Sequence, residues 1–154
     1  MKTKKKQNPL EKAYKQTRLD YSYTQKRITE MLSSIGISKV RFTKEGNDHV
    51  VEFIAKIQKN ESSRKVRINV PYTPELEDKN LDVEKQTNIL FRVLFYHLKS
   101  KFVAIYNGLK EFEEEFLPDL VVLVEGKEVR MGDIIAPQYR QQLKKNKIPV
   151  LKLN

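Results

Sequence analysis

The sequence lacks cysteine and tryptophan altogether, and it contains only two histidines and five glycines in 154 residues. Without cysteine it has no disulfides, thiolate nucleophiles, cysteine-ligated zinc sites or iron–sulfur clusters. His49 and His97 lie far apart in the sequence and have no acid or nucleophile at a recognisable offset. No glycine-rich phosphate loop is present. These absences predict a protein that is not an enzyme and that has no cofactor.

Long hydrophobic stretches are also missing. The aliphatic run Leu120–Val124 falls far short of the roughly 20 residues needed to cross a bilayer, and no hydrophobic segment follows the N-terminal lysines. We therefore expect no membrane partner and a cytoplasmic location. The hydrophobic content of 39%, with seven phenylalanines and seven tyrosines, is sufficient for one folded core.

The net charge of +10 is concentrated at the two ends of the chain. Residues 1–27 hold nine basic residues and two acidic ones, and residues 137–154 hold five basic residues and no acidic one. Residues 100–136 are acidic, with eight carboxylates against four cations. This asymmetry points to an anionic partner at the ends, although a lysine-rich tail that merely solvates the protein is the alternative.

The spacing of apolar residues predicts an α+β fold in which an N-terminal helix and a long helix pack on one face of a three-stranded antiparallel meander. A small hairpin and a C-terminal helix follow. The expected ranges are 24–35 and 82–109 for the two helices, 39–43, 49–58 and 64–70 for the strands, 110–117 for a short segment, 120–124 and 128–131 for the hairpin, and 133–145 for the last helix. Residues 1–22 are predicted to be a flexible basic arm, and residues 23–154 a single domain.

The period of two in the meander sends a set of cations to the face opposite the helices. Glu52 is the only acid expected on that face, and Val50 and Ile54 are its apolar members, which leaves room for a symmetric contact between two copies of the chain. The cations are Lys39, Arg41, Lys56, Lys65 and Arg67. Such a face suits phosphate contacts better than base stacking, because it carries no aromatic side chain. A solvated sheet face is the alternative.

The basic ends complete the predicted nucleic-acid-binding surface. Nucleic acid, either DNA or RNA, is the expected partner, since clustered cations release counterions when they bind phosphates. The residues expected to bind are Lys4, Lys5, Lys6, Lys12, Lys15 and Arg18 in the arm, and Lys144, Lys145 and Lys147 near the C-terminus. Lys85, Arg92 and Lys99 form a further row along the long helix, which is also what the polar face of any amphipathic helix shows.

A protein-binding module is the second hypothesis. Its expected contact surface is the run Phe112, Glu113, Glu114, Glu115 and Phe116, whose acidic members are alternatively a solvated face or a dock for the basic arm. A metal-dependent nuclease is the third hypothesis, based on Asp119, Glu125 and Lys127. We expect these two carboxylates to lie ~20 Å apart at the ends of one strand, too far to share a metal ion.

Several segments resemble a group of uncharacterised short proteins of bacterial phages and mobile elements. The likeness covers about residues 24–154, although Phe91 stands where that group has tryptophan. It rests on Phe91-Arg92, residues 99–105, Gly108, the box Phe112–Leu117, the hairpin at 125–129, Ile135-Ala136-Pro137 and the closing segment 148–151. The resemblance implies a setting inside the host cell of a phage or mobile element, and no activity. The corresponding hairpin in that group has no Glu-x-Lys pair, which implies that the carboxylates of Asp119 and Glu125 are incidental.

Overall fold

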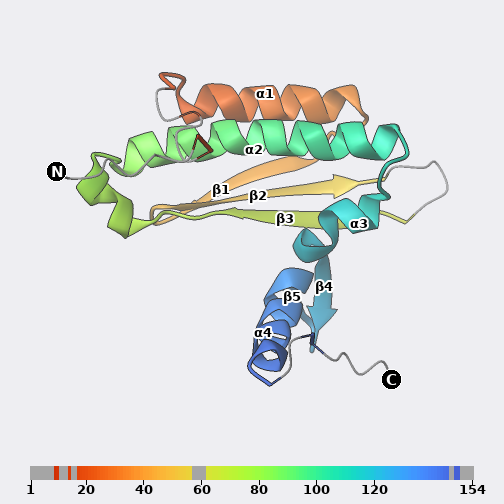
Figure 1. Ribbon diagram of the computed structural model, residues 1–154. Coiled ribbons are helices and arrows are strands. Elements are labelled where there is room, and N and C mark those ends of the chain that lie inside the picture. The colour runs from red at the N-terminus through yellow and green to blue at the C-terminus, as the bar shows by residue number, and fades with distance from the viewer. Residues whose placement is uncertain (1–8, 11–13, 15–16, 57–61, 146–147, 150–154) are drawn as a thin grey trace.

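In the computed structural model, two helices cover one face of a three-stranded antiparallel sheet, and a hairpin with a C-terminal helix lies on the other side (Figure 1). The predicted α+β order is therefore confirmed. The elements are α1 (Tyr21–Ser34), β1 (Val40–Glu45), β2 (Asp48–Ala55), β3 (Arg64–Val70), η1 (Pro74–Lys79), α2 (Val83–Tyr106), α3 (Phe112–Phe116), η2 (Leu117–Asp119), β4 (Val121–Val124), β5 (Lys127–Arg130) and α4 (Met131–Leu143).

The structure describes residues 9–10, 14, 17–56, 62–145 and 148–149. Most of the predicted basic arm lies outside these residues, and so do Ile57, which was expected to belong to the second strand, and Lys147 near the C-terminus. No helix in the described part of the chain is both long enough and apolar enough to span a membrane.

Both covering helices begin at an aspartate. The carboxylate of Asp20 accepts a hydrogen bond from the backbone N–H of Ser22, and that of Asp82 accepts one from the N–H of Lys85. Each bond satisfies a donor that has no partner inside the helix. α1 therefore starts three residues before the predicted position at Thr24. It ends at Ser34, one residue before the predicted end, and Gly36 just beyond it adopts a φ of +86°.

The sheet has the predicted division into two faces. Phe53 on the central strand pairs with Val40 on β1 and with Val66 on β3, so apolar side chains line up beneath the helices. Glu52 pairs with Arg41 and Arg67 on the opposite face. The strands thus keep the period of two that the sequence indicated.

The core is aromatic where α2, α3 and the sheet meet. The ring of Phe116 lies edge-on to Phe53, with centroids 5.9 Å apart, and it also packs against Phe102 and Phe112 at 5.3 and 4.8 Å. Phe116 has no exposed surface and Phe112 is also buried. α3 is therefore held to the domain by its two phenylalanines.

The sequence did not predict the 3₁₀-helix η1, which connects the sheet to α2. The buried side chain of Gln86 holds this connection. Its amide nitrogen donates to the carbonyls of Thr73 and Leu81, and its amide oxygen accepts from the N–H of Thr73. Three hydrogen bonds from one side chain fix a segment that carries no regular ladder.

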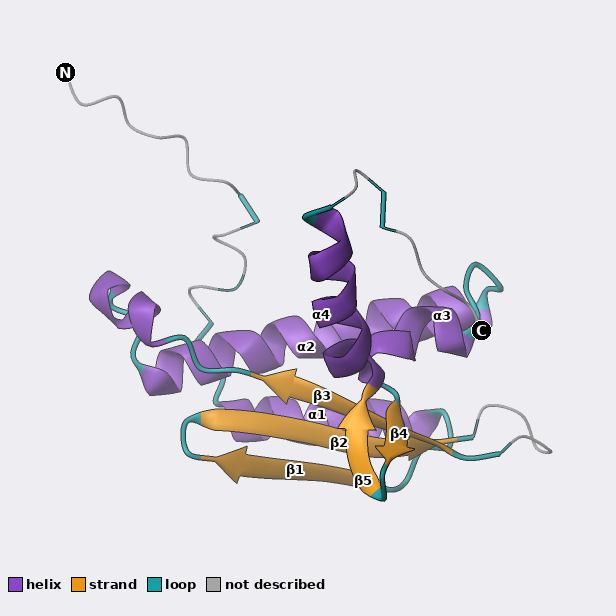
Figure 2. Cartoon of the chain, turned by 90° about the horizontal axis from the view of Figure 1, so that it is seen from below, coloured by secondary structure: helices purple, strands orange, loops and turns teal. Residues whose placement is uncertain are grey.

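The hairpin β4–β5 lies across the face of the sheet that the helices leave uncovered (Figure 2). An antiparallel bridge joins Leu120, just before β4, to Val66 on β3. Gly132 at the start of α4 packs closely against η2. A Cβ atom at this position would lie 2.9 Å from the carbonyl oxygen of Pro118, so a larger residue would not fit without a shift. The face opposite the helices is therefore only partly open, since the hairpin covers part of it.

Stability should fall as the pH drops from about 7 to about 5.5, and His49→Phe should reduce that fall. His49 is buried against the rings of Tyr21 and Phe91, and this burial, together with nearby Lys44, lowers the pKa of its imidazole. As the pH falls, the unfolded chain, whose histidine pKa is about 6.5, binds a proton on His49 more readily than the folded protein does. Urea unfolding at several pH values measures the effect.

The matched control is His97→Gln, because burial and Lys101 also lower the pKa of His97. This variant should keep the part of the pH dependence that His49 causes. An unchanged pH dependence in His49→Phe would contradict the assignment.

Candidate nucleic-acid interface

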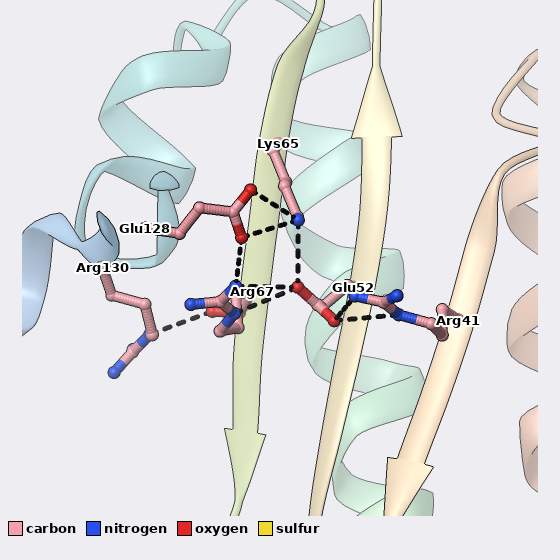
Figure 3. Close-up of polar contacts among 6 residues, drawn as sticks. All are labelled: Arg41, Glu52, Lys65, Arg67, Glu128 and Arg130. Atoms are coloured by element: carbon pink, nitrogen blue, oxygen red, sulfur yellow. Dashed lines mark hydrogen bonds and ion pairs between the residues drawn. The ribbon is translucent and has the colours of Figure 1, made fainter. Parts of the chain in front are cut away.

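The cations of the sheet face converge on one buried carboxylate, that of Glu52. The Nε and Nη2 atoms of Arg41 donate to its Oε1 at 3.1 and 2.6 Å, and Nε of Arg67 donates to its Oε2 at 3.1 Å (Figure 3). Nζ of Lys65 lies 3.4 Å from the same Oε2. The side chain of Glu52 is only 8% exposed, so both of its oxygens are satisfied within the protein.

A second carboxylate reaches this network from the hairpin. Glu128 on β5 accepts from Nζ of Lys65 at 2.9 and 3.0 Å, and from Nη2 of Arg67 at 2.7 Å. Arg130, two residues on, donates from Nε to the backbone carbonyl of Arg67 at 2.9 Å and from Nη2 to Asp119 at 2.7 Å. These contacts attach the hairpin and η2 to the third strand (Figure 3).

The pKa values of both carboxylates reflect this pairing. Burial alone raises the pKa of Glu52, but the hydrogen bonds from Arg41 and Arg67 and the charge of Lys65 outweigh it and hold that pKa below its ordinary value. The pKa of Glu128 is lowered chiefly by its hydrogen bond from Lys65. Both carboxylates therefore stay ionised at neutral pH and neutralise the cations around them.

This pairing changes the role expected of the sheet face. Three of the five predicted phosphate-binding cations, Arg41, Lys65 and Arg67, already share two carboxylates. Lys39 and Lys56 are exposed and have no ion pair within the described part of the chain. A hollow of about 630 Å³ separates the sheet from the hairpin, but arginines and carboxylates line it together. Phosphate binding there would have to compete with the internal ion pairs.

The predicted protein-binding run is also occupied internally. Phe112 and Phe116 belong to the core, so the prediction that they contact a partner is wrong. Side chains of the same chain pair with each acidic residue between them. Oε1 of Glu113 lies 2.5 Å from Nη2 of Arg64. Oε2 of Glu114 lies 3.8 Å from Nζ of Lys110, and Oε2 of Glu115 lies 3.2 Å from Nζ of Lys101. The run closes α3 onto α2 and β3, and its two phenylalanines are not available to a partner.

The structure supports no metal site at the nuclease-like carboxylates. Asp119 lies in η2 and is paired with Arg130, whereas Glu125 lies in the turn beyond the far end of β4. Among the residues that the structure describes, no group of three histidines, aspartates or glutamates is placed to hold a metal ion.

The outer side of the helices carries cations of a different kind. The guanidinium of Arg27 lies 4.3 Å from the centroid of the Phe95 ring, and that of Arg92 lies 5.1 Å from the centroid of Tyr96. Neither arginine has an ion pair in the described part of the chain. The same is true of three exposed lysines on this layer, Lys26, Lys85 and Lys99. Stacking on aromatic rings holds the arginines in place and leaves their charge available.

One aromatic residue of the N-terminal segment lies on this layer. The ring of Tyr14 stacks on Tyr96 with centroids 5.4 Å apart and planes 5° from parallel. Sequence reasoning placed Arg92 and Lys99 on this side of the long helix but missed Arg27 and the two stacked tyrosines. The i, i+4 spacing of Arg92 and Tyr96 was the available signal, because it puts both on one helix face.

Of the predicted binding residues at the chain ends, the structure describes three. Arg18 lies in the segment leading to α1 and is exposed, and Lys144 and Lys145 are exposed just after α4. Lys4, Lys5, Lys6, Lys12, Lys15 and Lys147 lie outside the described residues.

Glu52→Gln should destabilise the protein by about 2 kcal/mol at neutral pH, because it removes the charge that three cations share and weakens their hydrogen bonds. The folded pKa of Glu52 is lowered, so its contribution is present above about pH 4.5 and is lost as the pH falls. The variant should therefore lose less stability than the parent between pH 6 and pH 3.5. Urea unfolding measures both effects. Lys39→Gln is the control, and a loss of similar size in it would contradict the shared role of Glu52.

Two arrangements of charge thus lie on opposite sides of the sheet. One is a neutralised network between the sheet and the hairpin, and the other is a row of unpaired cations beside aromatic rings on the helices. No family model, no curated protein and no solved structure matches the chain.

Proposed function

We propose that the protein is a non-enzymatic nucleic-acid-binding accessory protein, acting in the cytoplasm of the host cell of a phage or mobile element. Its phosphate-binding surface is the outer side of α1 and α2, extended by the basic N-terminal residues. The observation that carries the proposal is the contrast between the two faces. The five cations named on the outer side of the helices have no carboxylate partners in the described part of the chain, although Lys101 of α2 pairs with Glu115. Three of the five sheet-face cations pair with carboxylates.

Unpaired cations are the ones that gain from phosphate contact. Lys26, Lys85 and Lys99 are exposed, so phosphate binding costs them no internal ion pair. Arg27 and Arg92 are held by ring contacts and lose little side-chain freedom on binding. In the segment before α1, Tyr14 lies on α2 and Arg18 is exposed. A continuous basic surface of this kind gives affinity that falls steeply with salt.

Replacing Lys26, Lys85 and Lys99 together by glutamine should weaken binding and reduce its salt dependence. Each lost phosphate contact lowers the slope of log affinity against log salt by about 0.9 for duplex DNA and about 0.7 for single strands. The expected reduction is therefore about two to three. Fluorescence anisotropy with labelled duplex and single-stranded oligonucleotides over a range of salt concentrations measures it.

A matched control removes the same charge from the other side of the molecule. Lys39 and Lys56 on the sheet face and Lys127 on β5, changed together to glutamine, should leave the slope close to that of the parent protein. Deleting residues 2–18 should remove a further large part of the affinity if the arm joins the same surface. Flat, weak binding by the parent at every salt concentration would rule out the function. An equal reduction of the salt slope in the control would show that the sheet face takes part in binding.

A protein-binding module is the second candidate, and one observation favours it. None of the residues of β4, β5 and α4 is buried. An apolar groove of about 330 Å³ lies between α4 and η2, and its lining includes Leu117, Ile135 and Tyr139. The exposed apolar side chains of this region are Leu117 of η2, Leu123 and Val124 of β4, and Ile135, Tyr139 and Leu143 of α4. An apolar surface that continues across several elements is typical of a contact with another chain.

Self-association through this surface is the form that can be measured directly. Sedimentation velocity over a range of protein concentrations should show a dimer that Ile135→Lys abolishes, since the new charge would be placed in an apolar contact. Gln141→Lys is the control, because it adds the same charge at an exposed position of α4 that does not line the groove. A monomer at every concentration would exclude a second copy of the chain as the occupant.

A further inference from the structure

We propose that Tyr96 is a base-stacking site for single-stranded nucleic acid, at the position now taken by the ring of Tyr14. This inference rests on the proposed function and adds to it the class of ligand and the residue that contacts the base. A purely electrostatic surface would bind any polyanion, whereas a stacking site requires an unpaired base.

The contact between the two tyrosines shows that a flat ring fits on Tyr96. Their planes are 5° from parallel with centroids 5.4 Å apart, which is an offset stack. Phe95 supports Tyr96 from its edge, with planes at 81° and centroids 5.2 Å apart. The platform is therefore fixed by the helix and its neighbour, while Tyr14 belongs to the segment before α1.

Tyr14 is held in this position against its own backbone preference. Its φ is 63°, in the left-handed region that residues with a Cβ rarely adopt. One backbone hydrogen bond, from the N–H of Thr17 to the carbonyl of Tyr14, closes the turn. Its side chain remains 39% exposed on the ring. A base that stacks equally well on Tyr96 would replace Tyr14 and release that backbone conformation.

Cations flank the platform along the helix. Arg92, Tyr96 and Lys99 follow one another at i, i+4 and i+7 on one face of α2, with one turn rising about 5.4 Å. A base on Tyr96 thus has a positive charge about one turn away on either side, where the phosphates of the same strand pass. Nη1 of Arg92 is shielded from solvent and has no hydrogen-bond acceptor among the residues that the structure describes. A phosphate or carbonyl oxygen brought to this ring would supply the acceptor.

The sharpest test compares two strands of equal charge, an oligothymidylate of about twelve nucleotides and an abasic strand of the same length. The parent protein should bind the thymidylate about tenfold or more tightly than the abasic strand at the same salt concentration. Tyr96→Leu should abolish that difference, and Tyr96→Phe, which keeps the ring, should retain it. Tyr14→Ala should raise the affinity for the thymidylate, because the base no longer has to displace a ring.

Tyr139→Leu is the matched control, since Tyr139 is an exposed tyrosine on α4. It should bind both strands as the parent protein does. Circular dichroism melting of each variant shows that the helices remain folded. Equal affinity of the parent for the two strands, with salt-sensitive binding to both, would overturn the stacking site and leave the proposed function standing. Absence of binding to either strand and to duplex DNA would overturn both.

Discussion

The carboxylate of Glu52 is the constraint around which the exposed side of the sheet is organised. It is buried in the middle of the central strand, so its charge requires partners, and β1 and β3 supply Arg41, Lys65 and Arg67. The cations that satisfy it are then oriented toward the strand centre. Glu128 pairs with the same Lys65 and Arg67, and these contacts hold the hairpin against the sheet. One buried charge thus fixes the position of a neighbouring structural unit.

This arrangement separates charge that supports the fold from charge that is available for binding. On the sheet face, Arg41, Lys65 and Arg67 are paired with Glu52 and Glu128, and these ion pairs contribute to stability. On the outer side of the helices, Lys26, Lys85 and Lys99 are exposed and Arg27 and Arg92 lie over aromatic rings, and none of the five has an ion pair in the described part of the chain. The net charge of +10 therefore does not by itself indicate which cations can bind an anionic partner. Each cation has first to be assigned to one of these two groups.

The fold was predictable because its signals are local. Aspartates at helix starts, glycine at a helix end, and a period of two in the strands each act within a few residues. The element order and the two faces of the sheet followed from them. The 3₁₀-helix before α2 was missed because it is held by Gln86, through hydrogen bonds to residues up to 13 positions away. The site was less predictable, because the neutralising contact between Glu128 and Lys65 spans 63 positions.

By itself, the sequence determined that the protein has an α+β fold and which residues alternate between the two sides of the sheet, since hydrophobic periodicity alone decides these properties. It also determined that both ends of the chain are basic. Only the tertiary structure decided which cations are free, because that depends on whether a carboxylate distant in the sequence lies within bonding distance. It also showed that Phe112 and Phe116 fill the core instead of a partner surface, and that an aromatic ring stacks on Tyr96. Burial and pairing are properties of packing, and a periodic pattern cannot specify them.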